Sequence, residues 1–309
     1  MGLARMMQHS WAENTEQPLL YTSEFLQSVY SYPGVDLGLS PTLVRDTGLA
    51  AFIGGFPRAV QFRGRPFRML LNTFLTVSPE YKKAGYGPMM WRELAKRGRA
   101  AGFDGTLSFC VEGDNMNRMI TGISRLFNER TYPIFDVNYM MRVLRPTLPE
   151  SKREEGSDIE ATLLLDLSRR VRSHACLART WTAEEAEWQC YRRFGAVTSS
   201  LAVSSRRGLI TGYLMVVSGK TPVKCVVLDD LLWGDLDNSE RDVLLETFLR
   251  RAAEYGAQLA TVPLMGYADT DPLTRAKFRK TRRILHAYYT SWGDAGPTEA
   301  LDQMYVDVL

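Results

Sequence analysis

The sequence predicts an α/β fold built from two tandem copies of one unit. Three observations support this prediction. The chain has 309 residues, enough for two medium-sized domains, and its content of 45% hydrophobic and 24% charged residues is that of a soluble globular protein. Helical and strand-like stretches alternate along the chain. Five landmarks recur in the same order in its two halves.

The repeat is carried by five pairs of segments. They are 21–34 with 181–195, 46–56 with 206–216, 70–77 with 227–233, 98–111 with 251–264, and Gly113 with Gly266. The offset falls steadily from 161 residues (34 to 195) to 153 residues (113 to 266), as small loop deletions would produce. We expect residues 1–146 to form one domain and 158–309 a second. Residues 147–157 would be a linker, because prolines followed by charged residues surround them.

Within each copy the residue pattern gives the order of elements. One or two helices come first, followed by a long strand-rich stretch with turn signals such as GGFP. An amphipathic helix follows, which carries Met90 and Leu94 on one face and ends at Gly102. A short strand at 106–111, a helix from about Asn115 and a closing strand, FDVNYMMRVL, complete the unit.

Composition sets the expected environment and partners. A formal net charge of +3 is too small to indicate nucleic-acid or membrane binding, so we expect no DNA, RNA or membrane partner. No apolar run approaches the roughly 18 residues that span a bilayer, and the N-terminal stretch lacks the apolar core of a secretory signal. The four cysteines are scattered without a CxxC pair. We expect a cytoplasmic protein with reduced thiols and no metal site, with a monomer or a homodimer left open.

Two glycines stand at the start of the amphipathic helix, in the stretch KKAGYG (82–87). Glycine lets the backbone approach a ligand closely, and the first turn of a helix offers unpaired N–H groups to an anion. A Walker loop would need GKS or GKT here, but Pro88 and Met89 follow Gly87. A dinucleotide fingerprint would need a third glycine where Met90 stands. Two interpretations remain: a short bend that faces a diphosphate and runs directly into a helix, or a simple turn before a core helix.

At these residues the chain resembles the GNAT N-acetyltransferase superfamily, whose motif is a strand, then Gln/Arg-x-x-Gly-x-Gly/Ala, then a long helix. The motif stands at 82–87 after the strand LLNTFLTV, with Val77-Ser78-Pro79 as its lead-in, and Lys82 replaces the Gln or Arg of the family. The resemblance covers most of 20–145 in the order of elements. It implies an α/β (α+β) fold of two tandem GNAT-like domains, each a mixed, mostly antiparallel sheet flanked by helices.

The resemblance also implies an acyl-CoA, most simply acetyl-CoA, held in a V between two splayed strands. Carried over by position, the backbone of Leu75, Thr76 and Val77 would pair with the pantetheine arm. Asn115 would lie near the CoA arm or, as the alternative, cap the next helix with Asp114. The residues that would surround the diphosphate are Lys82, Lys83, Ala84, Gly85, Tyr86 and Gly87.

The second copy differs at the corresponding places. Gly234 is followed by acidic and cap-forming residues, 235–240, whose negative charge would repel a diphosphate, so we expect this copy to keep the fold without a cofactor site. Asp229 and Asp230 stand mid-strand between apolar residues, where one of two neighbours faces inward. Two interpretations stay open for them: a strand bend with solvated carboxylates, or substrate-binding residues in a cleft between the domains.

Acyl transfer to an amine needs a base for the amine and a proton donor for the leaving thiolate. Glu112, at the end of the second splayed strand, is the candidate base, with a surface or capping role as the alternative. GNAT relatives often carry a tyrosine acid on the following helix, but Gly122 stands there. The acid role stays open between Tyr132, Tyr139, a water chain and direct departure of the thiolate. The sequence thus predicts a GNAT-type N-acetyltransferase, acting on an amine of a small molecule or peptide.

Two other functions stay open. An aminoacyltransferase of the FemABX type, which uses aminoacyl-tRNA, would account for the basic stretch RAKFRKTRR (275–283), although a solvated face also explains it. A non-catalytic acyl-CoA-binding sensor would account for the missing helix tyrosine. The intact motif at 82–87 favours CoA over tRNA.

Overall fold

The structure is a computed structural model of the chain. It describes residues 2–11, 19–45, 48–113, 115–145, 158–218, 222–293 and 296–308, without the side chains of 115, 123–125 and 158. The expected linker, 147–157, falls outside the described residues. The division of the chain at that linker therefore stays a prediction.

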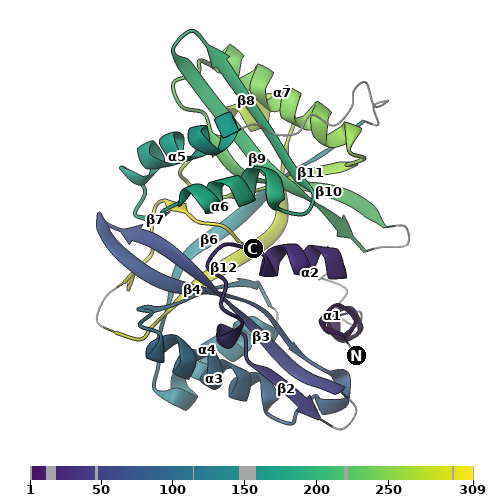
Figure 1. Ribbon diagram of the computed structural model, residues 1–309, viewed down its shortest axis with the longest axis vertical. Helices are drawn as coiled ribbons and strands as arrows, with labels where there is room; N and C mark the ends of the chain where they lie inside the picture. Colours follow the sequence, from purple (N-terminus) through teal and green to yellow (C-terminus); the bar gives the residue numbers. More distant parts are fainter. Residues whose placement is uncertain are drawn as a thin grey trace.

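The N-terminal half contains the elements expected from the sequence, in the expected order (Figure 1). Its helices are α1 (Leu3–Trp11), α2 (Ser23–Tyr30), α3 (Tyr86–Ala100) and α4 (Asn115–Phe127), with 3-10 turns η1 (Leu37–Leu39) and η2 (Pro79–Tyr81). Its strands are β1 (Leu19–Leu20), β2 (Thr42–Arg45), β3 (Gly48–Phe62), β4 (Arg65–Val77), β5 (Gly105–Val111) and β6 (Arg130–Val143). Gly102 follows α3 with a φ of 75°, as a glycine that ends a helix should.

The C-terminal half repeats this order. Its helices are α5 (Asp158–Arg172), α6 (Ala183–Glu187), which continues into the π-helical turn η3 (Trp188–Arg192), α7 (Asn238–Glu254) and α8 (Asp271–Arg275). Its strands are β7 (Leu177–Arg179), β8 (Ala196–Val203), β9 (Arg206–Val217), β10 (Val223–Leu232), β11 (Leu259–Leu264), β12 (Arg279–Ser291) and β13 (Met304–Tyr305). Thr22 and Thr182 cap the corresponding helices α2 and α6, each accepting a backbone N–H through its hydroxyl oxygen. The internal repeat of the sequence is therefore a repeat of elements.

The strands form one continuous mixed sheet. Its order is β1-β9-β10-β11-β6-β12-β5-β4-β3-β7-β13, with β2 beside β3 and β8 beside β9. The closing strands of the two copies exchange places: β6 pairs with β11 of the other half, β12 pairs with β5, and β6 and β12 pair with each other. This corrects the expectation that FDVNYMMRVL closes its own unit. Both closing strands run through the middle of the molecule (Figure 1), where their mutual pairing joins the two halves.

Helices cover the two faces of this sheet unequally. In the first half, α3 and α4 pack on one face, where Trp91, Leu94 and Ile120 meet residues of β3, β4 and β5. In the second half, α7 covers its strands through Leu245 and Phe248. The other face of the first half packs against α1 and α2. The predicted architecture, a mixed sheet flanked by helices, is confirmed.

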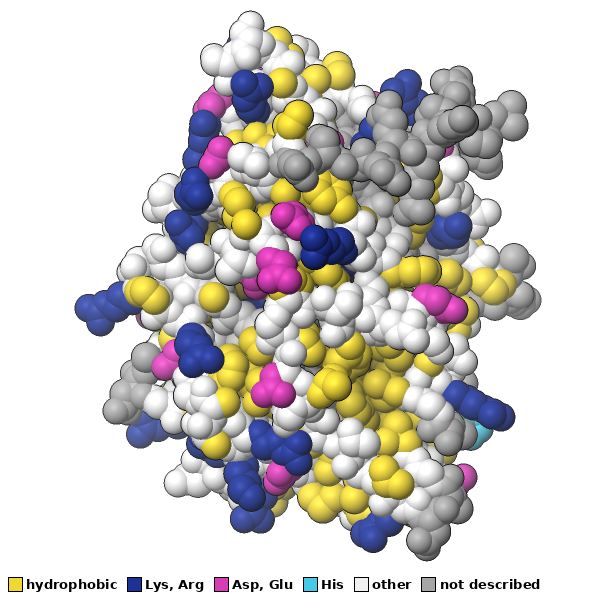
Figure 2. Space-filling model, in the orientation of Figure 1, with side chains coloured by type: hydrophobic (Ala, Val, Ile, Leu, Met, Phe, Trp, Pro, Cys, Tyr) yellow, Lys and Arg dark blue, Asp and Glu magenta, His cyan; other side chains and the backbone are white. Residues whose placement is uncertain are grey.

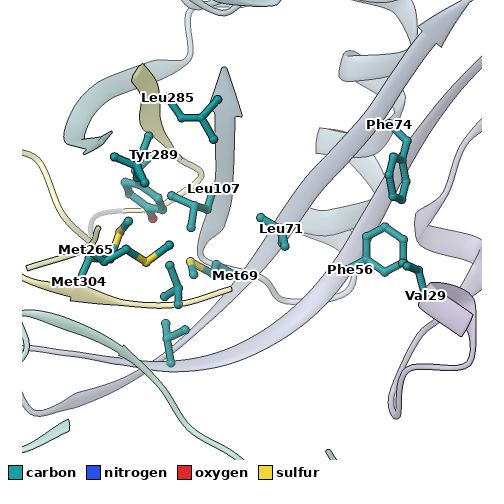
Figure 3. Packing of buried hydrophobic residues seen from close by; sticks show 14 of the residues in the cluster. Val29, Phe56, Met69, Leu71, Phe74, Leu107, Met265, Leu285, Tyr289 and Met304 are labelled. Carbon is teal, nitrogen blue, oxygen red and sulfur yellow. The ribbon is translucent and has the colours of Figure 1, made fainter. Parts of the chain in front are cut away.

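The largest core cluster extends across both halves of the chain. Figure 3 shows Phe74, Phe56 and Val29 at one end of this cluster, and Met265 and Met304 with Met69 at the other. Residues of the second half are thus buried among those of the first. At roughly 1.5–3 kcal/mol for each large side chain buried, this shared core fixes how the halves are placed.

The displayed face of the molecule carries charged side chains of both signs, and hydrophobic side chains gather in its lower half (Figure 2). Figure 2 shows Lys and Arg side chains scattered over the displayed face together with Asp and Glu. Among the described residues, no helix has both the length and the apolar character to cross a bilayer. All four cysteines are free thiols, as expected.

Candidate active site

The V expected between two strands is formed by β4 and β5. These strands run parallel and pair only where Met69–Asn72 lies beside Gly105–Ser108, and the Asn72 side-chain amide donates to Ser108 Oγ at the last pair. Beyond that point β4 stays with β3 as far as Val77, and β5 stays with β12 as far as Val111. The two strands therefore separate and leave a wedge between them.

The glycine bend lies at the mouth of this wedge and leads into α3. Gly85 is the N-cap of α3, with a φ of 78° and no side-chain cap, and Lys83 also has a positive φ of 71°. A Cβ built on Gly85 would meet nothing within 4 Å, so the space in front of it is open. An uncapped helix N-terminus directs backbone N–H groups and a partial positive charge into that space. The geometry suits a phosphate group.

Cations surround this bend. Lys82 and Lys83 are exposed within it, and Lys82 together with Gly87 lines the adjoining cavity. Arg45 on β2, which the sequence analysis missed, donates from Nε to the Tyr86 hydroxyl at 3.3 Å, with its guanidinium 5.7 Å from the ring centre. The basic residues and the helix N-terminus would attract the same anion.

The corresponding place in the second half is closed by its own side chains. Asp237 caps α7: its carboxylate accepts from the Glu240 backbone N–H, and the Glu240 carboxylate accepts from the Asp237 N–H. This capping box satisfies donors that an anion would otherwise use. The predicted helix cap at 237–239 is confirmed. Gly234 has no open space in front of it, because a Cβ there would lie 2.0 Å from the Arg207 carbonyl oxygen.

β4 carries a bulge at the wedge. Thr73 pairs with Gly54 and Thr76 with Phe52, so β4 has one residue more than β3 in this interval. Phe74 takes a φ of 60°, a conformation that costs on the order of 1–3 kcal/mol for a residue other than glycine. Its buried ring packs against Tyr21 at 5.2 Å and Phe56 at 6.0 Å, which holds the strained backbone in place. A bulge releases backbone groups from the strand ladder at this cavity wall.

A cavity of about 610 Å³ continues from the wedge across the sheet into the second half. Its floor is one face of the sheet, because lining residues alternate along most of its strands and alternate residues point to the same side. Examples are Phe109 and Val111 on β5, Tyr139 and Met141 on β6, and Val227 and Asp229 on β10. On β4, at the bulge, the consecutive residues 72–77 line the cavity. Trp11 of α1, Leu19 of β1 and Val308 also contribute to its wall. The cavity thus takes residues from both copies.

Five of the site residues predicted for the first half line this cavity. Leu75, Thr76, Val77, Lys82 and Gly87 do so. Lys83, Ala84 and Gly85 lie exposed in the bend beside it, and Tyr86 is half-buried there. Asn115 begins α4, but its side chain lies outside the described residues. Sequence analysis missed Met116 and Met119 of α4, which also line the cavity next to Gly87.

The two catalytic candidates lie elsewhere. The described residues that line the cavity do not include Glu112 or Tyr132. Glu112 is exposed just beyond β5, and Tyr132 packs half-buried on β6 against the core. Tyr139, the other candidate acid, does line the cavity, and burial raises its pKa to about 12. The sequence could not show which of these two tyrosines lines the cavity, because that depends on how β6 packs against the other strands.

The side chains of Asp229 and Asp230 are both buried. The β9–β10 ladder skips Asp229, since Leu228 pairs with Gly212 and Asp230 with Thr211. This bulge turns the Asp229 side chain, which is 5% exposed, to the cavity wall. The carboxylate accepts from Arg193 Nη1 at 2.7 Å and Gln189 Nε2 at 2.8 Å through the same oxygen, Oδ2. The interpretation of solvated carboxylates at a strand bend is therefore wrong.

Asp230 belongs to a buried polar network instead. It accepts hydrogen bonds from Thr211, from Gln189 at 3.1 Å and from the Tyr305 hydroxyl at 2.7 Å. Burial, and then the neighbouring Asp229 charge, raise its pKa to about 6. It does not line the large cavity in the described part of the chain, although it borders a small pocket with Asp229.

A second ion cluster anchors the end of the chain beside this network. Asp307 pairs with Arg58 of β3 at 2.5 Å and with Arg179 of β7 at 3.0 Å, all three side chains being at most 5% exposed. Burial alone would raise the pKa of Asp307, but the Arg179 and Arg58 guanidiniums lower it to about 2. The ionised Asp307 thus holds the segment that brings Val308 to the cavity.

Splayed parallel strands, a bulge on the first of them and a glycine bend that opens a helix give the first half a GNAT fold, and the second half repeats its order of elements. Saccharomyces cerevisiae N-myristoyltransferase with bound myristoyl-CoA is similar over 96% of this chain and 81% of its own, with a TM-score of 0.71 and 15% identity. A second structure of the yeast enzyme with myristoyl-CoA is similar over 96% and 76%, with a TM-score of 0.71 and 14% identity. A GCN5-related N-acetyltransferase from Kribbella flavida is similar over 93% and 67%, with a TM-score of 0.51 and 15% identity. These likenesses confirm the fold; no family model and no curated protein matches the sequence.

Proposed function

We propose that the chain is an acyl-CoA-dependent N-acyltransferase whose first half binds the acyl-CoA. The observation that carries this proposal is one continuous space that runs from the uncapped N-terminus of α3, through the wedge, to the buried carboxylate of Asp229. Its first end suits a diphosphate, its middle suits an extended thioester arm, and its far end holds polar groups suited to an amine. The neighbouring structures named for N-acyl transfer support the same function.

The residues that would hold acyl-CoA follow from this arrangement. The backbone of residues 82–87 and the N–H groups of the first turn of α3 would bind the diphosphate, with Arg45 adding charge from β2. The free side of β4 at 75–77 would pair with the amides of the pantetheine arm, since no strand pairs with it on the β5 side of the wedge among the described residues. The backbone released by the bulge at Phe74 would stabilise negative charge on the thioester oxygen.

We propose that the acyl group is longer than acetyl. The cavity has about 610 Å³, in the range of pockets that enclose whole drug-sized ligands, and an acetyl group would leave most of that space empty. Its walls are largely apolar, with Met116, Met119 and Phe109 near the wedge. A fatty acyl chain would fill this space with favourable burial of apolar surface. Two of the neighbours are named as bound to myristoyl-CoA, which supports a long chain.

The acceptor would enter on the side of the second half and meet the thioester near the bulge. In the reaction the C–N bond forms and the C–S bond breaks, and the amine proton leaves as CoA departs as a thiol. Tyr139, with a pKa of about 12, would be protonated at neutral pH and able to donate to the departing sulfur. The roles predicted for Glu112 and Tyr132 stay untested, and their position outside the cavity leaves them less suited to direct proton transfer.

The decisive experiment measures CoA species and thiol release. Mass spectrometry of the purified protein should detect co-purifying acyl-CoA, and release of free CoA thiol from a C2–C16 series of acyl-CoAs should depend on added amines. If no acyl-CoA binds at micromolar concentration, the proposal is wrong. Binding without amine-dependent release would favour the alternative of an acyl-CoA sensor, for which the position of Glu112 and Tyr132 is the supporting observation.

A further inference from the structure

The basic stretch 275–283 contributes to the far end of the cavity, a role that the proposed function does not explain. Arg275 at the end of α8 pairs with Asp242 at 2.9 Å, and Arg279, Lys280 and Arg282 are exposed. Thr281 and Arg283 alternate with them on β12 and line the cavity. The stretch therefore presents one face to solvent and places a half-buried guanidinium in the cavity wall.

Asp229 supplies the opposite charge in the same cavity. Arg193 and Gln189 fix its carboxylate through Oδ2, and the described part of the chain places no hydrogen-bond donor on the other oxygen, Oδ1. The side chain is 95% buried, and it lines the cavity. A carboxylate held by one oxygen keeps acceptor capacity on the other, which an ammonium group can use.

Tyr139 shows that the two charges act on one region. Tyr139 lies on β6, between β11 and β12, and lines the cavity. Its pKa, raised by burial, is lowered by the Arg283 charge and raised by the Asp229 charge. Arg283 also lowers the pKa of Tyr21, whose ring lines the same cavity. One phenol is thus within electrostatic reach of both a cation and an anion, in surroundings formed by apolar residues such as Met141 and Leu285.

We propose that the acyl acceptor is a free amino acid, with its ammonium group bound by Asp229 and its carboxylate by Arg283. This inference rests on the proposed function, because the amine is placed for attack on an acyl-CoA held in the wedge. A guanidinium binds a carboxylate through two parallel hydrogen bonds, so it selects for an acceptor with an anionic group near the amine. The cavity must also hold the acyl chain within about 610 Å³, which favours a small acceptor over a peptide.

The chemistry balances without any further reactant. The amino acid gives up one ammonium proton to become nucleophilic, and its nitrogen replaces sulfur at the acyl carbon. The products are an N-acyl amino acid, CoA as free thiol and one proton. Asp229 and Arg283 serve as binding residues in this scheme and form no covalent bond.

The test compares acceptors that differ only in the carboxylate. We would measure CoA thiol release by the full-length protein with glycine against glycinamide and leucine against leucinamide, at a saturating acyl-CoA. The amide is the less basic amine and carries more of the neutral nucleophile at a given pH, so a preference for the acid cannot arise from reactivity. We expect at least a tenfold higher kcat/KM for the acid in each pair.

Variants then locate the origin of that preference. Arg283→Gln should remove the preference by lowering kcat/KM at least tenfold more for the acids than for the amides, and Arg283→Lys should keep part of it. Arg282→Gln is the matched control, because Arg282 is the exposed neighbour on the same strand. Equal use of acid and amide by the wild type, or an equal loss of preference in Arg282→Gln, would overturn the proposal.

Acyl-CoA binding, measured by titration in the same preparations, separates this inference from the proposed function. Normal acyl-CoA binding with no acylation of either amino acid overturns the amino-acid acceptor and leaves the acyl-CoA site intact. Absence of acyl-CoA binding overturns both.

Discussion

Replacing Gly85 by glutamate tests the acyl-CoA site at the residue that the bend depends on. The new side chain would project into open space in front of α3, because a Cβ there meets nothing within 4 Å. Two unit charges 4 Å apart in water repel by about 1 kcal/mol, so one carboxylate beside the two charges of a diphosphate costs about 2 kcal/mol. That corresponds to about 30-fold weaker binding of acyl-CoA.

The substitution also strains the backbone, and this effect needs its own control. A left-handed conformation costs a residue with a side chain about 1–2 kcal/mol. Gly34 has the same φ, 79° against 78° for Gly85, with equally open space around its Cβ, and lies in the turn after α2. Gly34→Glu should therefore lose the same stability and keep normal acyl-CoA affinity. Gly234 cannot serve as the control, because a side chain there would clash with the surrounding residues.

The assay is isothermal titration with acyl-CoA at low salt, repeated at about 1 M salt, where the Debye length falls to about 3 Å. Gly85→Gln has nearly the same shape as Gly85→Glu without the charge. The difference between these two variants should account for most of the 30-fold loss and should shrink at high salt. Wild-type affinity in Gly85→Glu, or an equal loss in Gly34→Glu, would refute the assignment of this bend to a diphosphate.

Three further predictions follow from the cavity and the buried ion clusters. Each methylene added to the acyl chain should lower the Kd of the acyl-CoA by about fourfold until the cavity is full, because burial contributes about 0.8 kcal/mol per CH2. A Kd that is constant from C2 to C12 in a competition assay would contradict the proposed long chain. Asp307→Asn leaves Arg58 and Arg179 without their shared counter-charge. It should lower the free energy of unfolding, measured with denaturant at pH 7, by about 3–5 kcal/mol. A loss below about 1 kcal/mol would contradict a structural role for this ion cluster. Because the folded pKa of Asp307 is about 2, below that of an unfolded aspartate, its contribution to stability is present above about pH 4 and is lost toward pH 2. The folded pKa of Asp230 is raised to about 6, so its contribution to stability depends on pH in the opposite direction and is lost as pH rises from about 4 through 6. The free energy of unfolding of the wild type should therefore fall relative to that of Asp230→Asn over this range. A constant difference between the two would argue against the raised pKa.

Local features of the fold could be predicted from the sequence because they depend on near neighbours. The glycine bend, the start of α3 and its end at Gly102 each follow from residues within one or two turns. The capping box of α7 is equally local, since Asp237 and Glu240 are three residues apart. The repeat of elements was visible because other local signals recur in both copies, such as Gly102 after α3 and Gly256 after α7.

Long-range features could not be predicted, because they depend on the partner strand. β6 pairs with β11 and β12 pairs with β5, each in the other half of the chain. Nothing in the sequence of either strand distinguishes this partner from the strand of its own half. The bulges at Phe74 and Asp229 are defined only by the register of β3 and β9. Alternation along a single strand predicted that one of two adjacent aspartates faces inward, and the bulge buries both.

The two copies differ in a way that makes them complementary. In the first, Gly85 gives α3 no side-chain cap, so its N-terminal donors stay available to an external anion. In the second, Asp237 and Glu240 satisfy the donors of α7 internally, and no anion is needed there. The second copy instead uses its splayed strand to bring the Asp229 bulge to the wall of the shared cavity, while the exchanged strand β12 brings Arg283 to the same region. Under the proposed function, one copy would bind the acyl donor and the other would supply the wall for the acceptor, and the strand exchange places the residues of both on one face of a single sheet.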